Sequence, residues 1–202
     1  MHPRETGAHY DRVALWYQRN IPATYGVAQL ERALRFAENK GAALDVGCGS
    51  NGRFLEVFLR GGFQPEGVDV SGEMIALARQ RHPGVPFYHA DICEWELPRR
   101  YDFLSAWDST FHLPIEQQEP VLRKLCAGLN PGGVLLFTCG GGEAEEITGS
   151  FEGQTFGYST LGVDEFLRLL MLFGCSCLHV EYDQYPENHV YIIARKRPRS
   201  VR

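Results

Sequence analysis

The chain has 202 residues, of which 44% are hydrophobic and 22% charged, with a formal net charge of −5. This composition is ordinary for a folded protein, and the length suits a single domain of roughly 100 to 200 residues. The negative net charge gives no general attraction to phosphate backbones, so we expect no nucleic-acid partner. Every apolar run is much shorter than the ~20 residues that cross a bilayer, so no membrane span is expected.

The two ends and the cysteines carry no strong functional signal. Residues 1–10 lack the apolar stretch of a secretory signal, which predicts a cytoplasmic location. The one basic cluster, residues 195–202, is more typical of a solvated terminus than of an anion site. The six cysteines have neither metal-finger nor disulfide-scaffold spacing, so we expect buried, reduced thiols and no metal. They stand at positions 48, 93, 126, 139, 175 and 177. Composition does not choose between a monomer and a homodimer.

Short apolar runs alternate with helical patterns, which is typical of a layered α/β domain. Strands are predicted at residues 42–46, 66–70, 85–89, 102–107, 133–139, 175–182 and 189–195. Helices are predicted at residues 10–19, 27–39, 53–60, 72–81, 115–129 and 163–173. Together they predict a doubly wound, mostly parallel seven-stranded sheet with helices on both faces and a C-terminal antiparallel hairpin.

This single domain, residues 1–202, divides into three parts by position. Residues 1–40 form a helical cap, and residues 41–140 form the core with its ligand-binding loops. Residues 141–202 supply a glycine-rich loop on the substrate side, a helix and the terminal hairpin. His179 and His189 fall in that hairpin, where we expect packing against the sheet, although residues 182–189 are unusually polar for a simple turn.

The strongest local pattern is a glycine-rich turn between the first core strand and the next helix. Gly47, Gly49 and Gly52 leave no Cβ in the way of a ligand, and the following helix start offers unpaired N–H groups. Asp45, at the end of the strand, can orient the loop or reach a cationic group. The spacing also fits a dinucleotide fingerprint, which likewise expects an acid about 20 residues later. Asp69 satisfies both interpretations, and it can also simply cap the next helix.

The order of four motifs favours one interpretation. Leu-Asp-Val-Gly-Cys-Gly from residue 44, Gly-Val-Asp-Val-Ser from 67, His-Ala-Asp-Ile-Cys from 89 and Leu-Asn-Pro-Gly-Gly from 129 follow one another. In order and spacing this series resembles the class I S-adenosylmethionine-dependent methyltransferase family over about residues 40–140. One departure is the interval from Gly49 to Gly52, which makes the loop one residue longer than is usual in that family.

The resemblance implies S-adenosylmethionine as cofactor and a set of residues that contact it. Gly47, Cys48 and Gly49 would lie against the methionine part, and Asp69 would bind the ribose. Asp91 would contact the adenine amino group, with Ile92 and Val70 on the two sides of the ring. Trp107 corresponds to the residue nearest the methionine backbone. The terminal antiparallel hairpin also fits this family better than a nicotinamide enzyme.

Candidates for work on the substrate follow the fourth core strand, because ligands bind at the carboxyl ends of parallel strands. Asp108 and His112 are the catalytic candidates, with His112 as a general base or as a histidine that fixes the loop. Tyr10, Tyr17 and Tyr158 are candidates for the pocket wall beside His112, although such aromatic residues can equally pack the helices onto the sheet.

The predicted function is therefore methyl transfer from S-adenosylmethionine to a small molecule. Two alternatives remain from the sequence alone. A noncatalytic module that binds S-adenosylmethionine or S-adenosylhomocysteine would keep Asp45, Gly47, Asp69 and Asp91 but would not need Asp108 or His112. A small NAD-dependent oxidoreductase fits the glycine pattern but not the predicted terminal hairpin.

Overall fold

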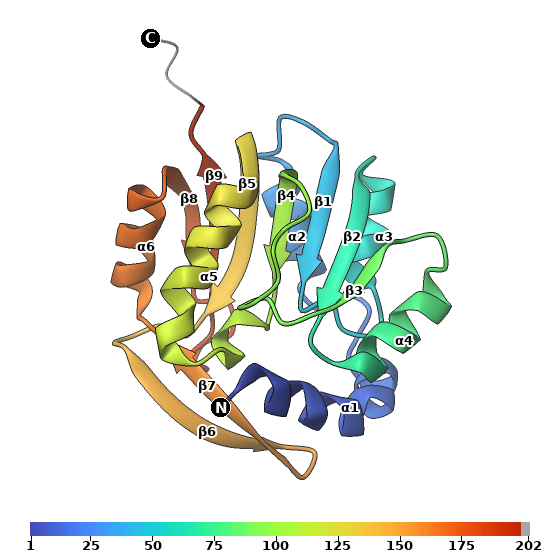
Figure 1. Cartoon of the computed structure of the whole chain (residues 1–202). Coiled ribbons are helices and arrows are strands. Elements are labelled where there is room, and N and C mark those ends of the chain that lie inside the picture. The colour runs from blue at the N-terminus through green and yellow to red at the C-terminus, as the bar shows by residue number, and fades with distance from the viewer. Residues whose placement is uncertain (199–202) are drawn as a thin grey trace.

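The computed structural model describes residues 1–198, and Arg199 and Arg202 of the predicted basic cluster lie outside this range. Seven strands form the main sheet in the order β3-β2-β1-β4-β5-β9-β8 (Figure 1). The strands are β1 (Ala42–Val46), β2 (Gln64–Asp69), β3 (Phe87–His89), β4 (Tyr101–Ala106), β5 (Leu129–Cys139), β8 (Cys175–Glu181) and β9 (Val190–Lys196). The first five run parallel, and β9 pairs antiparallel with both β5 and β8. The predicted sheet and its terminal hairpin are confirmed.

Helices cover both faces of this sheet. On one face α5 (Ile115–Gly128) and α6 (Val163–Leu172) bury residues such as Leu125 and Leu169 against the strands. On the other face α2 (Val27–Leu34) and α3 (Arg53–Arg60) bury Leu30 and Phe58. The helix α4 (Gly72–Arg81) packs beside β3 at the edge of the sheet. Apolar contact on both faces stabilises the parallel strands, which are buried along almost their whole length.

The first helix, α1 (Pro3–Asn20), begins seven residues earlier than predicted and lies across the carboxyl ends of the strands (Figure 1). His2 and Glu5 form a reciprocal cap at its start, with Pro3 in the first turn. The Asp11 carboxylate accepts hydrogen bonds from the Ser71 hydroxyl and the Glu73 amide at the start of α4. A Cβ at Gly7 would lie 2.7 Å from the Val70 carbonyl oxygen. The absence of that Cβ lets α1 approach the end of β2 closely.

Residues 140–162, which we predicted as a glycine-rich loop, instead contain a second sheet. The strands β6 (Glu145–Phe151) and β7 (Gln154–Thr160) pair antiparallel in an uninterrupted register. Thr and Tyr residues favour this hairpin, and Gly153 with φ +74° closes its turn. The hairpin lies beside α1 at the same end of the main sheet (Figure 1). The prediction was wrong because three glycines, Gly149, Gly153 and Gly157, masked the strand pattern.

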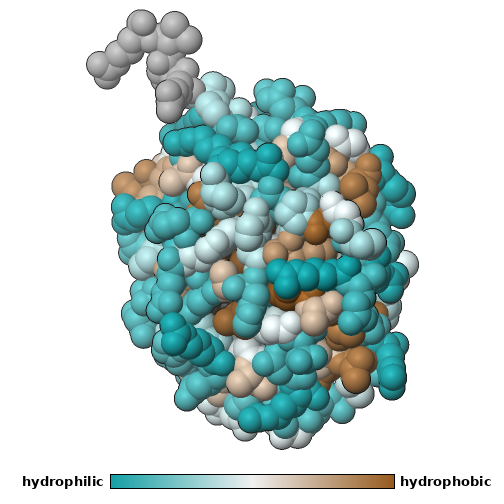
Figure 2. Space-filling view, turned by 45° about the vertical axis from the view of Figure 1, so that its right-hand side comes forward, coloured by the Kyte–Doolittle hydropathy of each residue, from teal (hydrophilic) through white to brown (hydrophobic). Residues whose placement is uncertain are grey.

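The cysteines and the surface differ in part from what the sequence predicts. All six thiols are free, but Cys177 is exposed and Cys93 half-buried, so the expectation of six buried thiols was wrong. Hydrophilic residues predominate on the face shown in Figure 2, where apolar surface is broken into small patches. Among the helices of residues 1–198, none combines the length and apolar character needed to cross a membrane. Of the basic C-terminal residues, Arg195 pairs with Glu38, and Lys196 and Arg197 donate to nearby backbone or hydroxyl oxygens.

Candidate active site

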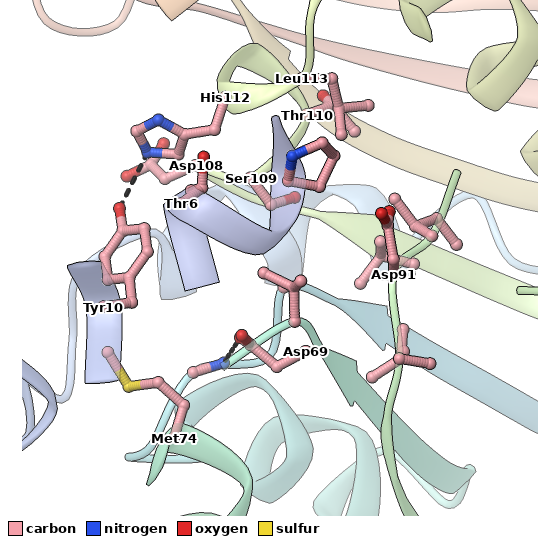
Figure 3. A pocket seen from close by; sticks show the side chains of 18 of the residues that line it. Thr6, Tyr10, Asp69, Met74, Asp91, Asp108, Ser109, Thr110, His112 and Leu113 are labelled. Carbon is pink, nitrogen blue, oxygen red and sulfur yellow. Dashed lines mark hydrogen bonds between the residues drawn. The ribbon is translucent and has the colours of Figure 1, made fainter. Parts of the chain in front are cut away.

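A cavity of about 740 Å³, counting the space open at its mouth, lies at the carboxyl ends of β1, β2 and β4 (Figure 3). This is the point where the strand order reverses, between β1 and β4, and open α/β sheets bind ligands at such points. Ten of the predicted site residues line it, namely Tyr10, Tyr17, Gly47, Gly49, Asp69, Val70, Asp91, Ile92, Asp108 and His112. Residues that the sequence analysis did not single out also line it, among them Thr6, Met74, Ser109 and Leu113.

The floor of the cavity is the glycine loop after β1. Gly47 and Gly49 have φ values of +71° and +60°, and a Cβ on Gly47 would lie 2.3 Å from the Ser109 Cβ. The Gly49 amide donates to Asp69 Oδ2 at 2.9 Å, and the Ser71 amide donates to Asp69 Oδ1 at 2.9 Å. Burial raises the pKa of Asp69, and these two backbone hydrogen bonds oppose the shift. The loop and the carboxylate therefore fix one another's position.

Asp91 lies on the opposite wall, after the neighbouring strand β3. Its Oδ1 accepts a hydrogen bond from the Cys93 amide at 2.9 Å. From α5, Lys124 Nζ donates to the carbonyl oxygens of Ile92 at 2.9 Å and of Trp95 at 2.8 Å, which anchors this loop to the body of the domain. Two carboxylates, Asp69 and Asp91, thus border the cavity from two adjacent parallel strands (Figure 3).

Three predicted cofactor contacts have side chains that do not line the cavity. Asp45 is buried below the loop, where it accepts a hydrogen bond from Ser105 Oγ at 2.6 Å, and burial raises its pKa to about 6. Cys48 packs into the core beside β3. The Trp107 indole belongs to the core on the face of α2 and α3, 5.9 Å from the Tyr191 ring. Their contact with a cofactor stays a prediction, and the structure gives these side chains a structural role.

Tyr10 and His112 meet at one end of the cavity, although 102 residues separate them in the chain. His112 Nδ1 lies 2.9 Å from the Gly157 carbonyl oxygen, which can only accept, so Nδ1 carries the proton. His112 Nε2 then accepts from the Tyr10 hydroxyl at 2.8 Å (Figure 3). Burial lowers the pKa of His112 to about 4 and raises that of Tyr10 well above its ordinary value. The pair is therefore neutral near pH 7.

Asp108 enters the same end of the cavity on a strained backbone, with φ +49°. Its carboxylate accepts hydrogen bonds from the Tyr25 hydroxyl at 2.8 Å and from His189 Nε2 at 2.9 Å. His189 Nδ1 lies 2.6 Å from Asp183 Oδ1. Burial lowers the pKa of His189, but its bonds to Asp108 and Asp183 outweigh burial and raise it. His189 thus links the side chains of Asp108 and Asp183 through its two ring nitrogens.

We expected His189 to pack against the sheet, and its ring does lie 5.5 Å from that of Trp107, but it also hydrogen-bonds to Asp108 after β4. The one signal in the sequence was the polar character of residues 182–189, which hold both Asp183 and His189. Tyr158, a predicted wall residue, packs its ring 4.8 Å from that of His112 but lines an adjacent cavity with Phe111.

Two hydroxyl groups on the cavity wall are buried and have no hydrogen-bond partner among the described residues. Thr6 belongs to α1, with 4% of its surface exposed, and Ser109 follows Asp108. A buried hydroxyl without a partner costs roughly 1–3 kcal/mol, so these two groups indicate a polar ligand in the cavity. Within residues 1–198, no three His, Cys, Asp or Glu side chains converge as a metal-ligand set.

Comparison with known proteins agrees with this geometry. Residues 43–133 match the family model described as a methyltransferase domain. Over 94 residues the chain is 37% identical to trans-aconitate 2-methyltransferase of an Acidovorax species. The aligned segment covers 46% of this chain and 35% of that enzyme. Over 104 residues it is 29% identical to the dTDP-3-amino-3,6-dideoxy-alpha-D-glucopyranose N,N-dimethyltransferase of Streptomyces fradiae, covering 50% of this chain and 40% of that protein. The matches therefore span less than half the length of these two relatives.

The fold has similar counterparts among solved structures. An amino pentose methyltransferase of Micromonospora echinaspora, solved with bound S-adenosylmethionine, superposes with a TM-score of 0.70 at 20% identity. That match covers 91% of this chain and 95% of the other. Residues 43–133 therefore carry the match to a methyltransferase domain, and the chain as a whole has the fold of this solved methyltransferase.

Proposed function

We propose that this protein transfers a methyl group from S-adenosylmethionine to a small molecule. The observation that carries the proposal is the pair of carboxylates, Asp69 and Asp91, that face one cavity beside a glycine loop at the switch point of the sheet. S-adenosylmethionine, when bound, supplies a methyl carbon on a positively charged sulfur.

The residues present fit this cofactor. Asp69 would accept the ribose hydroxyls, and Asp91 has one oxygen free of backbone bonds for the adenine amino group. A Cβ on Gly49 would meet only Tyr17, at 3.6 Å, so a side chain there would occupy cavity space that glycine leaves for the ligand. The buried hydroxyl of Ser109, which has no hydrogen-bond partner within residues 1–198, would find one in a polar ligand.

A small acceptor suits the cover over the cavity. Helix α1 and the β6–β7 hairpin are joined by hydrogen bonds, with Arg12 donating to Gln154 at 2.9 Å, and by packing of Tyr10 on Phe156. We propose that α1, within the helical cap of residues 1–40, closes over the bound molecules. Methyl transfer needs an aligned nucleophile and exclusion of water, and Tyr10, Tyr17, Asp108 and His112 stand where they can provide both.

The test is calorimetric titration of the purified protein with S-adenosylmethionine, S-adenosylhomocysteine and NAD. Asp69→Ala is expected to weaken binding of both adenosyl compounds about 10- to 100-fold, because hydrogen bonds to a charged group contribute roughly 1.5–3 kcal/mol. Asp102→Ala is the matched control. Asp102 also holds a backbone amide, that of Gly41 at 3.0 Å, but at the amino end of its strand, away from the cavity.

Three outcomes would contradict the proposal. They are binding of NAD alone, absence of adenosyl binding, and equal loss in the two variants. Adenosyl binding together with no turnover of any acceptor would instead favour a binding module, in which Asp108→Ala and His112→Ala leave function intact.

A further inference from the structure

The charged side chains that line the cavity are all acidic, although Arg53, which does not line it, lies near Tyr17 and Tyr25. Its charged wall residues are Asp69, Asp91 and Asp108, and the adjacent cavity behind Phe111 and Tyr158 adds Glu145 and Glu187. Among the described residues that line either cavity there is no lysine and no arginine. A carboxylate or phosphate buried here would lose its hydration without gaining a cationic partner, which is costly. The acceptor site therefore disfavours anionic molecules.

Aromatic faces and one carboxylate gather on the side of the cavity away from Asp91, next to the glycine loop. The Tyr10 and Tyr17 rings lie 6.2 Å apart with an angle of 85° between their planes, and both line the cavity. Asp108 lines it as well, with its carboxylate fixed by Tyr25 and His189. Aromatic faces set at right angles, with a carboxylate nearby, attract a cationic nitrogen.

Thr6 supplies an independent sign of a ligand at this end. Its hydroxyl is buried on the wall that α1 contributes, one helical turn before Tyr10, and it lacks a partner within residues 1–198. A hydroxyl oxygen can accept a hydrogen bond from an N–H group, and a nitrogen bound beside Tyr10 would satisfy it.

We propose that the methyl acceptor is an amine, held between Tyr10, Tyr17 and the carboxylate of Asp108. This inference rests on the proposed methyltransferase function and names its substrate class. An amine that binds as an ammonium ion first loses one proton to solvent water; the neutral nitrogen then attacks the methyl carbon, a nitrogen–carbon bond forms, the carbon–sulfur bond breaks, and sulfur keeps the electron pair. Positive charge moves from sulfur to nitrogen, and Asp108 faces a cation before and after the step.

The same site is poorly equipped for an alcohol acceptor. An alcohol must lose its proton as it attacks, which requires a general base. The nearest imidazole, His112, has Nδ1 protonated and Nε2 occupied by the Tyr10 hydroxyl, and burial keeps its pKa at about 4. An amine makes no such demand during the attack, because its proton can leave to solvent beforehand and the methylated product is stable as an ammonium ion.

The experiment uses two matched ligand series, chosen because aromatic rings wall the site and because sugars present many hydroxyls. One is phenethylamine, 2-phenylethanol and phenylacetate; the other is glucosamine, glucose and glucuronate. Binding of each to the protein saturated with S-adenosylhomocysteine is measured by calorimetry, and methylation with S-adenosylmethionine is followed by mass spectrometry. We expect binding and methylation of an amine, with at least tenfold preference over its alcohol and carboxylate counterparts.

Asp108→Asn then tests the proposed contact, with Asp164→Asn, an exposed acid on α6, as the control for net charge. We expect about tenfold weaker amine binding in Asp108→Asn and unchanged affinity for S-adenosylmethionine. Preference for an alcohol or a carboxylate, or no binding of either amine, overturns the proposal. So does a variant that weakens S-adenosylmethionine binding while amine binding persists, since Asp108 would then serve the cofactor. Failure of wild-type protein to bind adenosyl compounds would refute the methyltransferase function instead.

Discussion

The two ends of the cavity are built in different ways. The end with Asp69 and Asp91 is made of backbone amides and short loops, since the bonds from Gly49 and Ser71 to Asp69 span 20 and 2 residues. The end with Tyr10, Asp108 and His112 is made of side chains, joined by hydrogen bonds across 81 to 102 residues. The first depends on local geometry, whereas the second depends on the whole fold bringing α1, β7 and the terminal hairpin together.

This difference predicts where each end is fragile. Backbone-built geometry fails when a side chain intrudes, because amides and loop dihedrals cannot move independently. A side-chain network fails when one member loses its partner, because the remaining buried polar group is then unsatisfied. Substitutions of each kind can therefore separate the two ends experimentally.

The largest effect is expected from Gly47→Ala. The new Cβ would lie 2.3 Å from the Ser109 Cβ at a residue with φ +71°, so overpacking and backbone strain add to a loss of about 3 kcal/mol or more in unfolding free energy. Gly84→Ala is the control, because a Cβ there meets no heavy atom within 4 Å. Urea unfolding followed by circular dichroism measures both. Equal unfolding midpoints for the two variants would contradict the prediction, because they would mean that the loop accommodates a Cβ at Gly47.

A pH-dependent effect is expected at the side-chain end. An unfolded histidine has a pKa of about 6.5, whereas burial lowers that of His112 to about 4. Between these values the unfolded chain binds more protons than the folded chain, so stability falls as the pH falls from about 6.5 to 4. The loss approaches about 3 kcal/mol, and above pH 6.5 this histidine adds no pH dependence.

Urea unfolding of wild type and His112→Gln at pH 7.5 and pH 4.5 measures this contribution. The difference between the two proteins should shrink or reverse at the lower pH, because glutamine does not titrate. Subtracting the variant also cancels groups with the opposite behaviour, such as Asp45, whose raised pKa favours folding as the pH falls. A constant difference between the proteins at both values would contradict a buried, neutral His112.

Tyr10→Phe is expected to cost about 2 kcal/mol in unfolding free energy. The ring remains, but His112 Nε2 loses the hydroxyl that donates to it at 2.8 Å, and a buried acceptor is left unpaired. Tyr158→Phe is the control, since within residues 1–198 its hydroxyl makes no hydrogen bond although its ring packs on the same histidine. In thermal unfolding, Tyr10→Phe should have a lower midpoint than wild type, whereas Tyr158→Phe should not. Equal shifts in the two variants would assign the effect to ring packing.

The same contrast explains what the sequence could predict. The strands, the mostly parallel sheet with its terminal hairpin, and the residues of the glycine loop follow from local patterns, because hydrophobic periodicity and glycine spacing are read within a few residues. Asp69 was singled out in this way, whereas Asp91 came from the family resemblance, and both line the cavity. An acidic residue directly after a parallel strand lies at the carboxyl end of the sheet, where such sheets bind ligands.

The side-chain end was predicted only in part. Asp108 and His112 were found because they follow β4, but no local pattern pairs His112 with Tyr10. The β6–β7 hairpin was hidden by Gly149, Gly153 and Gly157, and its Gly157 carbonyl is what fixes the tautomer of His112. Trp107 was assigned to the cofactor from its position, yet its ring turns into the opposite face of the sheet. Contacts between distant segments depend on rotamers that the local sequence does not encode.

The smallest effect is expected from His189. Substitutions there distinguish a residue that positions Asp108 from one that touches the acceptor. His189 Nε2 donates to Asp108 Oδ1 at 2.9 Å, and Asp183 orients the His189 ring through Nδ1. His189 is therefore a positioning residue. His189→Leu should raise the KM for an accepted amine about fivefold, which corresponds to about 1 kcal/mol, without changing kcat more than twofold or the affinity for S-adenosylmethionine. His189→Gln, which restores one N–H donor, should recover most of the loss. If both variants lower kcat and cofactor affinity together, the terminal hairpin supports the whole cavity and the two ends are not independent.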